Sequence, residues 1–218
     1  MKNFAVIGNP IEHSLSPYLH NFVYKSLGKE ANYEKMKVQN NELPTVIDDL
    51  KRGILSGINV TIPHKENIIQ FLDEVNPRAK AIGAVNFIMK NGEKLIGNNT
   101  DWFGFFMALQ KNEIDPKNKE VIVLGAGGAA KAILFALKNM GVRKIFLLNR
   151  TIQKAEKLKD DIVYPFPLSE LVQTIKNDSI IINTTSIGMQ HAQSPIEMGL
   201  IHKNQTLIDV IYTPFETA

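Results

Sequence analysis

The chain has 218 residues, 44% of them hydrophobic, which is enough for one large or two ordinary domains. Its net charge of +3 is small and spread along the chain, so we expect neither nucleic acid nor a membrane surface as a partner. The absence of cysteine excludes disulfides and thiolate metal sites. The opening residues do not follow the signal-peptide pattern and the apolar runs are short, so we expect a cytoplasmic protein.

The first hundred residues alternate patterns typical of strands and helices. Strands are expected at 4–8, 33–38 and 57–62. Helices are expected at 17–27, 42–52, 65–72 and 78–82, the first capped by Ser14 or Ser16. Asn91-Gly92 predicts a hairpin between strands at 84–89 and 94–97. This alternation favours an α/β fold.

A second half follows an amphipathic helix expected at 101–111 and a polar linker at 115–119. A buried strand at 121–124 there runs into a glycine-rich turn and a helix at 129–140. Further strands are expected at 144–148, 179–183 and 206–211. We expect domain boundaries at 1–100 and 101–218, with ligands meeting in a cleft between the halves.

The glycine-rich turn matches the G-x-G-x-x-A pattern of dinucleotide-binding units. Gly125 permits the tight turn, Gly127 permits close approach of a pyrophosphate, and Ala130 permits close packing of helix on strand. The phosphates would lie at the helix N-terminus, where free N–H groups and the helix dipole favour anions. The alternative is a purely structural turn.

The end of the following strand indicates which dinucleotide is bound. NAD-specific units place an acidic residue there to bind the ribose 2′-hydroxyl. This chain has Asn149, Arg150 and Thr151, with Lys154 behind them, so cations and amides are available for a 2′-phosphate. The pattern predicts NADP, although Arg150 could also be an ordinary surface residue.

Four polar clusters lie at the ends of predicted strands of the first half, at the edge where α/β sheets bind ligands. They contain Ser14 and Ser16; Asn59, Thr61 and Lys65; Asn86; and Asn99, Thr100 and Asp101. Asn59 and Thr61, two apart, are expected on one face of their strand. Helix capping, turn support and a solvated lysine are the structural alternatives.

Dehydrogenation of an alcohol needs a hydride acceptor, a proton acceptor and polar groups that orient the substrate. Lys65 and Asp101 could exchange the proton as a coupled pair, because a nearby carboxylate stabilises an ammonium group. The five histidines offer no better base and no metal-ligand spacing, so no metal is expected. They are His13, His20, His64, His191 and His202.

The chain resembles the shikimate dehydrogenase family in a series of segments that run in family order from end to end. They are residues 6–21, 59–65, 82–86, 99–101, 124–129, 149–151, 183–189 and 209–217. The resemblance implies an N-terminal α/β substrate domain, a C-terminal Rossmann-like NADP domain, and reversible NADPH-dependent reduction of 3-dehydroshikimate to shikimate. It implies a monomer or a homodimer.

The resemblance also implies roles for individual residues. Lys65 is the general acid/base and Asp101 its partner. The substrate would be held by Ser14, Ser16, Asn59, Thr61, Asn86 and Tyr212. The pyrophosphate turn would comprise Gly125, Ala126, Gly127, Gly128 and Ala129. The adenosine 2′-phosphate would be surrounded by Asn149, Arg150, Thr151 and Lys154, and the nicotinamide side by Thr184, Ser186 and Met189.

The chain departs from the family pattern in three places. Phe87 stands where the family usually has Thr, and Trp102 where it usually has Gly. The family continues past residues 212–217 into further helices, one of which carries a substrate-binding glutamine, so we expect a fragment. Broader quinate/shikimate dehydrogenases and a non-catalytic NADP sensor are alternatives, although a sensor would be expected to lack Lys65 or Asp101. Folate-linked dehydrogenases fit the Ser14–Pro17 segment poorly.

Overall fold

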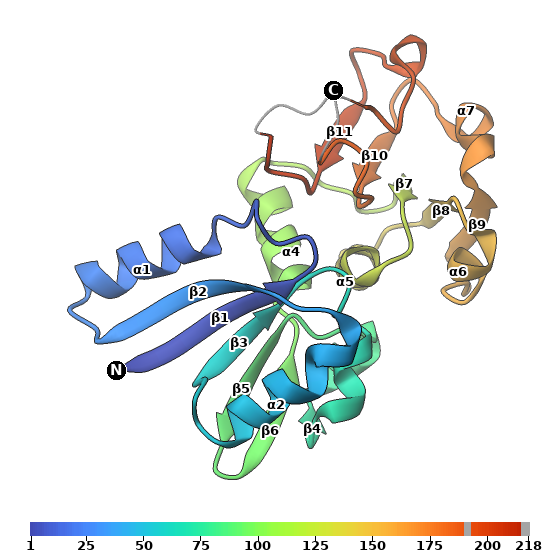
Figure 1. Ribbon diagram of the computed structural model, residues 1–218. Helices are drawn as coiled ribbons and strands as arrows, with labels where there is room; N and C mark the ends of the chain where they lie inside the picture. The colour runs from blue at the N-terminus through green and yellow to red at the C-terminus, as the bar shows by residue number, and fades with distance from the viewer. Residues whose placement is uncertain (190–192, 215–218) are drawn as a thin grey trace. The chain divides into compact units, whose positions relative to one another are not determined.

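The computed structural model describes residues 1–189 and 193–214, which form two compact units divided after Asp101 (Figure 1). Each unit has its own sheet and its own hydrophobic core. Every helix in the described ranges is too short or too polar to cross a membrane. The loop at 115–119, expected to join the two halves, instead lies inside the second unit.

The first unit is built on a six-stranded mixed sheet in the order β2-β1-β3-β5-β6-β4. Its strands are β1 (Lys2–Gly8), β2 (Ala31–Lys37), β3 (Gly57–Val60), β4 (Glu74–Val75), β5 (Phe87–Asn91) and β6 (Lys94–Asn98). The pairs of β1 with β2 and with β3 are parallel, and β5 runs antiparallel to both β3 and β6. The carboxyl ends of β1 and β3 therefore open at one edge.

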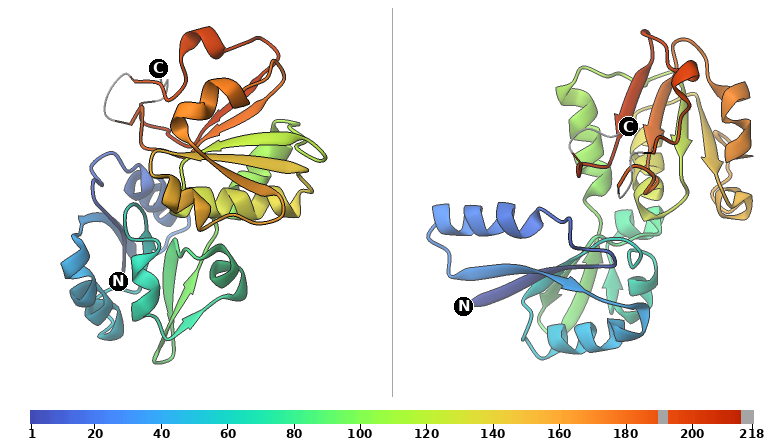
Figure 2. Two further views of the ribbon diagram at one scale, coloured as in Figure 1. Left: turned by 90° about the vertical axis from the view of Figure 1, so that its right-hand side faces the viewer. Right: turned by 45° about the horizontal axis from the view of Figure 1, so that its top comes forward.

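Helices cover both faces of this sheet (Figure 2). They are α1 (Ser16–Ser26), α2 (Leu43–Lys51) and α3 (Pro77–Ile82), with 3-10 turns η1 (Asn40–Glu42) and η2 (Asn67–Phe71). Helix α2 buries Leu43, Val46, Ile47 and Leu50, whose spacing puts them on one helical face. Helix α1 packs across β1 and β2 on the opposite face (Figure 2).

Several boundaries differ from the sequence predictions. The segment expected as a helix at 65–72 is only a 3-10 helix over Asn67–Phe71, so Lys65 lies in a turn. Strand β3 ends at Val60, and β5 begins only at Phe87, so Thr61 and Asn86 lie just outside the strands that were expected to contain them. The backbone of both residues still bonds to neighbouring strands: the Thr61 N–H donates to the Ile7 carbonyl of β1 and the Asn86 N–H to the Asn98 carbonyl of β6. The Asn86 side chain instead binds Thr100 and Asp101. The short strand β4 has too little periodic sequence to predict.

The first helix also begins differently. It starts at Ser16, with Leu15 at the N-cap and no cap bond from the Leu15 side chain. The Ser14 hydroxyl accepts from the Ser16 N–H, the first of the helix, at 3.3 Å, so Ser14 satisfies a free helix N–H as predicted, while Ser16 is itself the first helical residue.

The second unit contains a fully parallel five-stranded sheet in the order β11-β10-β7-β8-β9. Its strands are β7 (Glu120–Leu124), β8 (Lys144–Asn149), β9 (Val163–Pro167), β10 (Ile180–Asn183) and β11 (Thr206–Asp209). Alternate residues of β7 enter different core clusters, Val121 and Val123 on one face and Ile122 and Leu124 on the other. Burial on both faces is typical of a doubly wound sheet, and the Rossmann-like α/β prediction is confirmed.

The helices of this half are α4 (Asp101–Lys111), α5 (Gly128–Asn139), α6 (Ile152–Glu156) and α7 (Leu171–Thr174), with 3-10 turns η3 (Leu168–Glu170) and η4 (Met198–Leu200). Strand β9 and the short α6 and α7 were not predicted, because their apolar stretches are too short to show a period. Ala130, in the first turn of α5, is fully buried in the core of the second unit, as expected for a small side chain where helix and strand pack closely.

Candidate active site

The first unit brings Lys65 and Asp101 together, as expected for a coupled pair. The Lys65 Nζ lies 2.6 Å from Asp101 Oδ2, and the two side chains are 16% and 28% exposed. Both groups are thus largely shielded while still reachable, which strengthens their attraction over that of a surface pair. The pair joins a turn after β3 to the first residue of α4, 36 positions apart in sequence.

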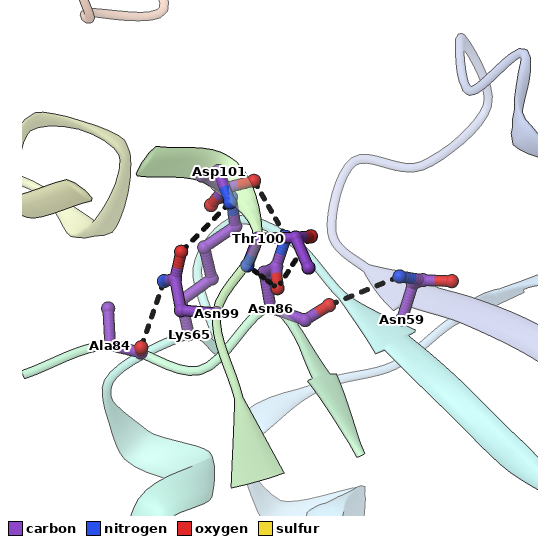
Figure 3. Close-up of polar contacts among 7 residues, drawn as sticks. All are labelled: Asn59, Lys65, Ala84, Asn86, Asn99, Thr100 and Asp101. Carbon is purple, nitrogen blue, oxygen red and sulfur yellow. Dashed lines mark hydrogen bonds and ion pairs between the residues drawn. The ribbon is translucent and has the colours of Figure 1, made fainter. Parts of the chain in front are cut away.

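Asn86 holds the other oxygen of the same carboxylate (Figure 3). Its Nδ2 donates to Asp101 Oδ1 at 2.8 Å and to Thr100 Oγ1 at 2.9 Å, while its Oδ1 accepts from the Thr100 N–H at 2.9 Å. Asn86 is 8% exposed, so its amide is committed to this network. Each Asp101 oxygen therefore has its own donor, and the carboxylate orientation is fixed.

Asn99 fixes the backbone of Asp101. Its Oδ1 accepts from the Asp101 N–H at 2.9 Å, and its Nδ2 donates to the Ala84 carbonyl at 2.9 Å (Figure 3). The side chain is 2% exposed. Asp101 also begins an eleven-residue helix, where the helix dipole favours a carboxylate.

The Lys65 backbone is positioned by its neighbours. Its carbonyl accepts from the Val85 N–H at 2.8 Å. The preceding His64 is fully buried, with Nε2 2.7 Å from the Val38 carbonyl and Nδ1 3.0 Å from Asn40 Oδ1. Both ring nitrogens are thus engaged, so His64 anchors the turn and is not exposed for proton transfer.

Asn59 lies at the inner end of this network. Its Nδ2 is 3.4 Å from the Asn86 carbonyl (Figure 3), and its Oδ1 accepts from the Tyr33 hydroxyl at 2.7 Å. Thr61 is half-buried beyond β3, where its N–H donates to the Ile7 carbonyl at 2.9 Å. Because Thr61 leaves the strand, strand alternation does not establish the predicted shared face.

The loop that carries Ser14 and Ser16 starts beside Thr61. A Cβ on Gly8 would lie 2.5 Å from the Thr61 methyl group, so only glycine allows this approach. Glu12 then ties the loop to β2, with Oε1 3.0 Å from Lys37 Nζ. Hydrogen bonds from the backbone of Glu12, from Lys37 and from the Ile11 N–H lower the Glu12 pKa to about 2. Both serines are half-buried.

In the second unit, the glycine turn follows β7 as predicted. Gly125 has φ +104°, and a Cβ there would lie 2.5 Å from the Thr184 hydroxyl oxygen, so both conformation and space require glycine. The Thr184 hydroxyl donates to the Leu124 carbonyl at 2.7 Å. The turn and the start of the loop after β10 are therefore in direct contact.

The predicted pyrophosphate turn fits a phosphate ligand. Gly127 is exposed, and a Cβ there would meet no atom within 4 Å. Helix α5 begins at Gly128 and runs for twelve residues, and its first-turn N–H groups have no partners within the helix. Ala126 is buried, and Gly128 and Ala129 are half-buried. Backbone donors beside open space are what an anion needs.

The predicted 2′-phosphate segment lies next to this turn, because the Gly125 N–H donates to the Leu148 carbonyl at 2.8 Å. Asn149 ends β8, and its Nδ2 donates to the Thr151 carbonyl at 2.8 Å. Arg150, Thr151 and Lys154 are exposed. The guanidinium group is accessible and no carboxylate occupies the strand end.

Asn183 organises the loop that contains Thr184, Ser186 and Met189. It is 5% exposed; its Oδ1 accepts from the Thr185 N–H and hydroxyl, and its Nδ2 donates to Asp209. Asp209 in turn accepts from the Ile211 N–H at 2.9 Å, next to Tyr212, which is 56% exposed. Ser186 is exposed and Met189 half-buried.

The two aromatic residues that depart from the family pattern lie in different units. Phe87 is half-buried at the start of β5, and Trp102 packs edge-on against Phe135 of α5 with ring centroids 5.5 Å apart. His13 and His202 are exposed, and His20 stacks on Tyr33. His191 and residues 215–217 of the last family segment lie outside the described residues.

Sequence patterns gave no organising role to Tyr33, His64, Asn183 or Asp209, and predicted Asn99 only as a member of the polar cluster before α4. Their contacts join segments far apart in the chain, so spacing could not reveal them. The available signal was an amide or ring inside apolar surroundings, which needs a buried partner.

Two family models match the chain. The shikimate dehydrogenase substrate binding domain matches residues 6–88, and shikimate / quinate 5-dehydrogenase matches residues 107–210. The chain belongs to the shikimate dehydrogenase family. A relative from Bacillus cereus strain AH187, named shikimate dehydrogenase (NADP(+)), is 42% identical over 98% of this chain and 80% of its own length.

Solved structures agree with this assignment. Shikimate dehydrogenase 1 from Peptoclostridium difficile superposes with a TM-score of 0.90 and 34% identity, covering 100% of this chain and 80% of its own. The enzyme from Thermus thermophilus, solved in complex with NADP(H) and shikimate, has a TM-score of 0.85 and 36% identity, covering 98% of this chain and 80% of its own. The family and its two-domain fold are thereby confirmed.

Proposed function

We propose that this protein catalyses the reversible NADPH-dependent reduction of 3-dehydroshikimate to shikimate, as an NADP-dependent shikimate dehydrogenase. The observation that carries the proposal is the ammonium–carboxylate–amide cluster of Lys65, Asp101 and Asn86. It offers a proton donor and acceptor, fixed in orientation and partly exposed, at the carboxyl edge of the first sheet. Membership of the family supplies the substrate class.

Lys65 is the proposed general acid in the direction of reduction. Its Nζ gives a proton to the ketone oxygen as the carbon is reduced, and takes the proton back in the oxidation of shikimate. When bound, NADPH would supply the hydride for the reduction, and NADP⁺ would accept it in the oxidation. Asp101 holds the direction of the ammonium group through their hydrogen bond, while Asn86 keeps the second Asp101 oxygen occupied.

The remaining polar groups are proposed to orient the substrate. Hydroxyls of Ser14, Ser16 and Tyr212 suit a carboxylate, and Asn59 and Thr61 suit ring hydroxyls. The unit 1–101 would be the substrate domain and the unit 102–218 the NADP domain. We also propose that the enzyme works in the cytoplasm, where NADPH supports biosynthesis, as a monomer or a homodimer.

The proposed cofactor contacts match a phosphorylated dinucleotide. The pyrophosphate would lie on Gly125–Ala129, where Gly127 leaves open space. Asn149, Arg150, Thr151 and Lys154 would surround the 2′-phosphate, with charge-assisted hydrogen bonds from Arg150. Thr184, Ser186 and Met189 would lie along the nicotinamide.

The experiment is a rate measurement of nicotinamide absorbance with shikimate and NADP on the native chain and on Lys65→Ala. A positioned general acid/base contributes about 10²–10⁴-fold, so kcat should fall by that factor while the shikimate KM changes little. Circular dichroism should show an unchanged fold. Near-normal turnover by a folded Lys65→Ala protein contradicts the assigned role.

Quinate oxidation is the second candidate, because the family model that matches residues 107–210 covers both substrates. The same assay with quinate, and with NAD in place of NADP, separates the two. A kcat/KM for quinate with NAD above that for shikimate with NADP would favour the second candidate.

A further inference from the structure

Tyr33 occupies an unusual position for a tyrosine that the proposed reaction does not use. It lies in β2 and is 3% exposed, in a small core cluster with Val6 and Ile11 on the α1 face of the sheet. A buried tyrosine needs a partner for its hydroxyl, since an unpaired hydroxyl in an apolar environment is costly.

Three contacts hold Tyr33 in place. Its ring stacks on His20 of α1, with centroids 4.2 Å apart and planes 9° from parallel. Its backbone pairs with the Asn21 side chain, which donates to the Tyr33 carbonyl at 2.8 Å and accepts from its N–H at 2.9 Å. Burial lowers the pKa of His20, which favours the neutral ring in this stack. Ring and backbone are therefore both fixed.

The hydroxyl reaches over β1 to the edge of the proposed site. Tyr33 is aligned with Phe4 of β1, and Asn59 of β3 with Val6, two residues further along β1. The hydroxyl donates to Asn59 Oδ1 at 2.7 Å. Neighbouring strands are about 4.8 Å apart, so the partner lies two strands away and only a long side chain can span the distance.

This bond decides which end of the Asn59 amide faces the Lys65 network. With Oδ1 engaged by the tyrosine, the NH₂ group is directed toward the Asn86 carbonyl, 3.4 Å away. That distance is at the limit of a hydrogen bond, so the NH₂ group keeps capacity to donate elsewhere. We propose that Tyr33 is a positioning residue that orients the Asn59 amide as a donor to a substrate hydroxyl, an inference that rests on the proposed function.

The test is Tyr33→Phe in the full chain, which removes only the hydroxyl. We expect the shikimate KM to rise about three- to tenfold, as for one impaired hydrogen bond, with the NADP KM unchanged. Tyr24→Phe is the matched control: it also removes a hydroxyl on the α1 face, and that hydroxyl makes no hydrogen bond to another described residue. Tyr24→Phe should leave both KM values as they were.

Asn59→Leu and the double variant Tyr33→Phe/Asn59→Leu distinguish positioning from a structural role. If Tyr33 acts through the amide, the hydroxyl no longer matters once the amide is gone, so Asn59→Leu and the double variant should have equal shikimate KM values. If Tyr33→Phe alone fails to fold, the comparison of Asn59→Leu with the double variant still tests the proposal. In the double variant both hydrogen-bonding partners are apolar, so no buried amide is left without a partner.

The outcomes separate the two proposals. No shikimate-dependent NADP reduction by the native chain contradicts the proposed function. An active native chain overturns the role of Tyr33 if Tyr33→Phe behaves like Tyr24→Phe, or if the double variant has a several-fold higher KM than Asn59→Leu.

Discussion

At the residue scale, the Asp101 carboxylate has a separate donor for each oxygen, Lys65 on one and Asn86 on the other. A carboxylate held on both sides cannot rotate away from the lysine without losing a hydrogen bond. The ammonium group is held in turn by a partner that cannot move. Removing Lys65 or Asp101 alone therefore leaves the charge of the other half-buried and unpaired, which costs more free energy than the ion pair itself contributes.

Asp101→Asn is expected to reduce kcat by about 10²-fold or more, because the amide keeps the shape but not the charge that orients Lys65. The loss should not add to that of Lys65→Ala, since residues that act as a unit are non-additive. The four kcat values of the cycle check this. If the double variant is slower than Lys65→Ala by the full factor that Asp101→Asn causes alone, the two residues do not act together and the prediction is falsified.

Arg150 should discriminate between the two nicotinamide cofactors. Charge-assisted hydrogen bonds contribute about 1.5–3 kcal/mol each, so Arg150→Ala should weaken NADP binding about tenfold to a hundredfold. Calorimetric titration with NADP and NAD measures the change. NAD affinity serves as the internal control and should hardly move; equal losses for the two cofactors would instead make Arg150 a structural residue.

At the scale of elements, each unit has proposed binding residues on loops that follow the carboxyl ends of its strands. The loop between β1 and α1 carries Ser14 and leads to Ser16 at the start of α1, and it is tied to β2 by Glu12 and Lys37. In the second unit, Asn183 and Asp209 tie together the loops after β10 and β11. These loops are thus tied by polar residues, Glu12, Asn183 and Asp209, that are not among the proposed ligand-binding residues.

The Glu12 tie gives the first unit a dependence on acid pH. Because the folded-state pKa of Glu12, about 2, lies below its ordinary value of 4.5, the contribution of Glu12 to stability is present above pH 4.5 and is lost as pH falls toward 2. The melting temperature of Glu12→Gln should lie below that of the native protein at pH 6 and approach it near pH 2.5. The gap at pH 6 should shrink in high salt, because Glu12 is exposed. A gap that is independent of pH contradicts the assignment.

At the scale of the whole molecule, each of the two units has its own core, and the proposed ligands divide between them. NADP should therefore slow hydrogen exchange at residues 125–130 and 149–154. At about 100 times Kd the linked stabilisation is about 2.7 kcal/mol, which corresponds to about hundredfold slower exchange where exchange requires opening of the bound site. The comparison region is β5 and β6. Protection confined to β5 and β6 contradicts the proposed division.

The α/β class and the glycine turn after β7 could be predicted from the sequence alone, and the family motifs pointed to Lys65 and Asp101 as a pair. These follow from local rules: buried strands are continuous apolar runs, Gly125 has a conformation that only glycine adopts readily, and the family motifs are short and contiguous. Local patterns missed the boundaries at Val60 and Phe87, because these depend on how neighbouring strands pair: Thr61 and Asn86 still donate to β1 and β6, although neither belongs to a strand.

The contacts that complete the sites became visible only in the folded chain. Tyr33 and Asn59 are 26 residues apart, Lys65 and Asp101 are 36 apart, and the Thr184 hydroxyl meets a carbonyl 60 residues away. Such contacts depend on strand order and register, which place β1 between β2 and β3 and β7 beside β10. A hydrogen bond depends on positions within a few tenths of an ångström, and sequence spacing carries no such information across strands that the chain visits far apart.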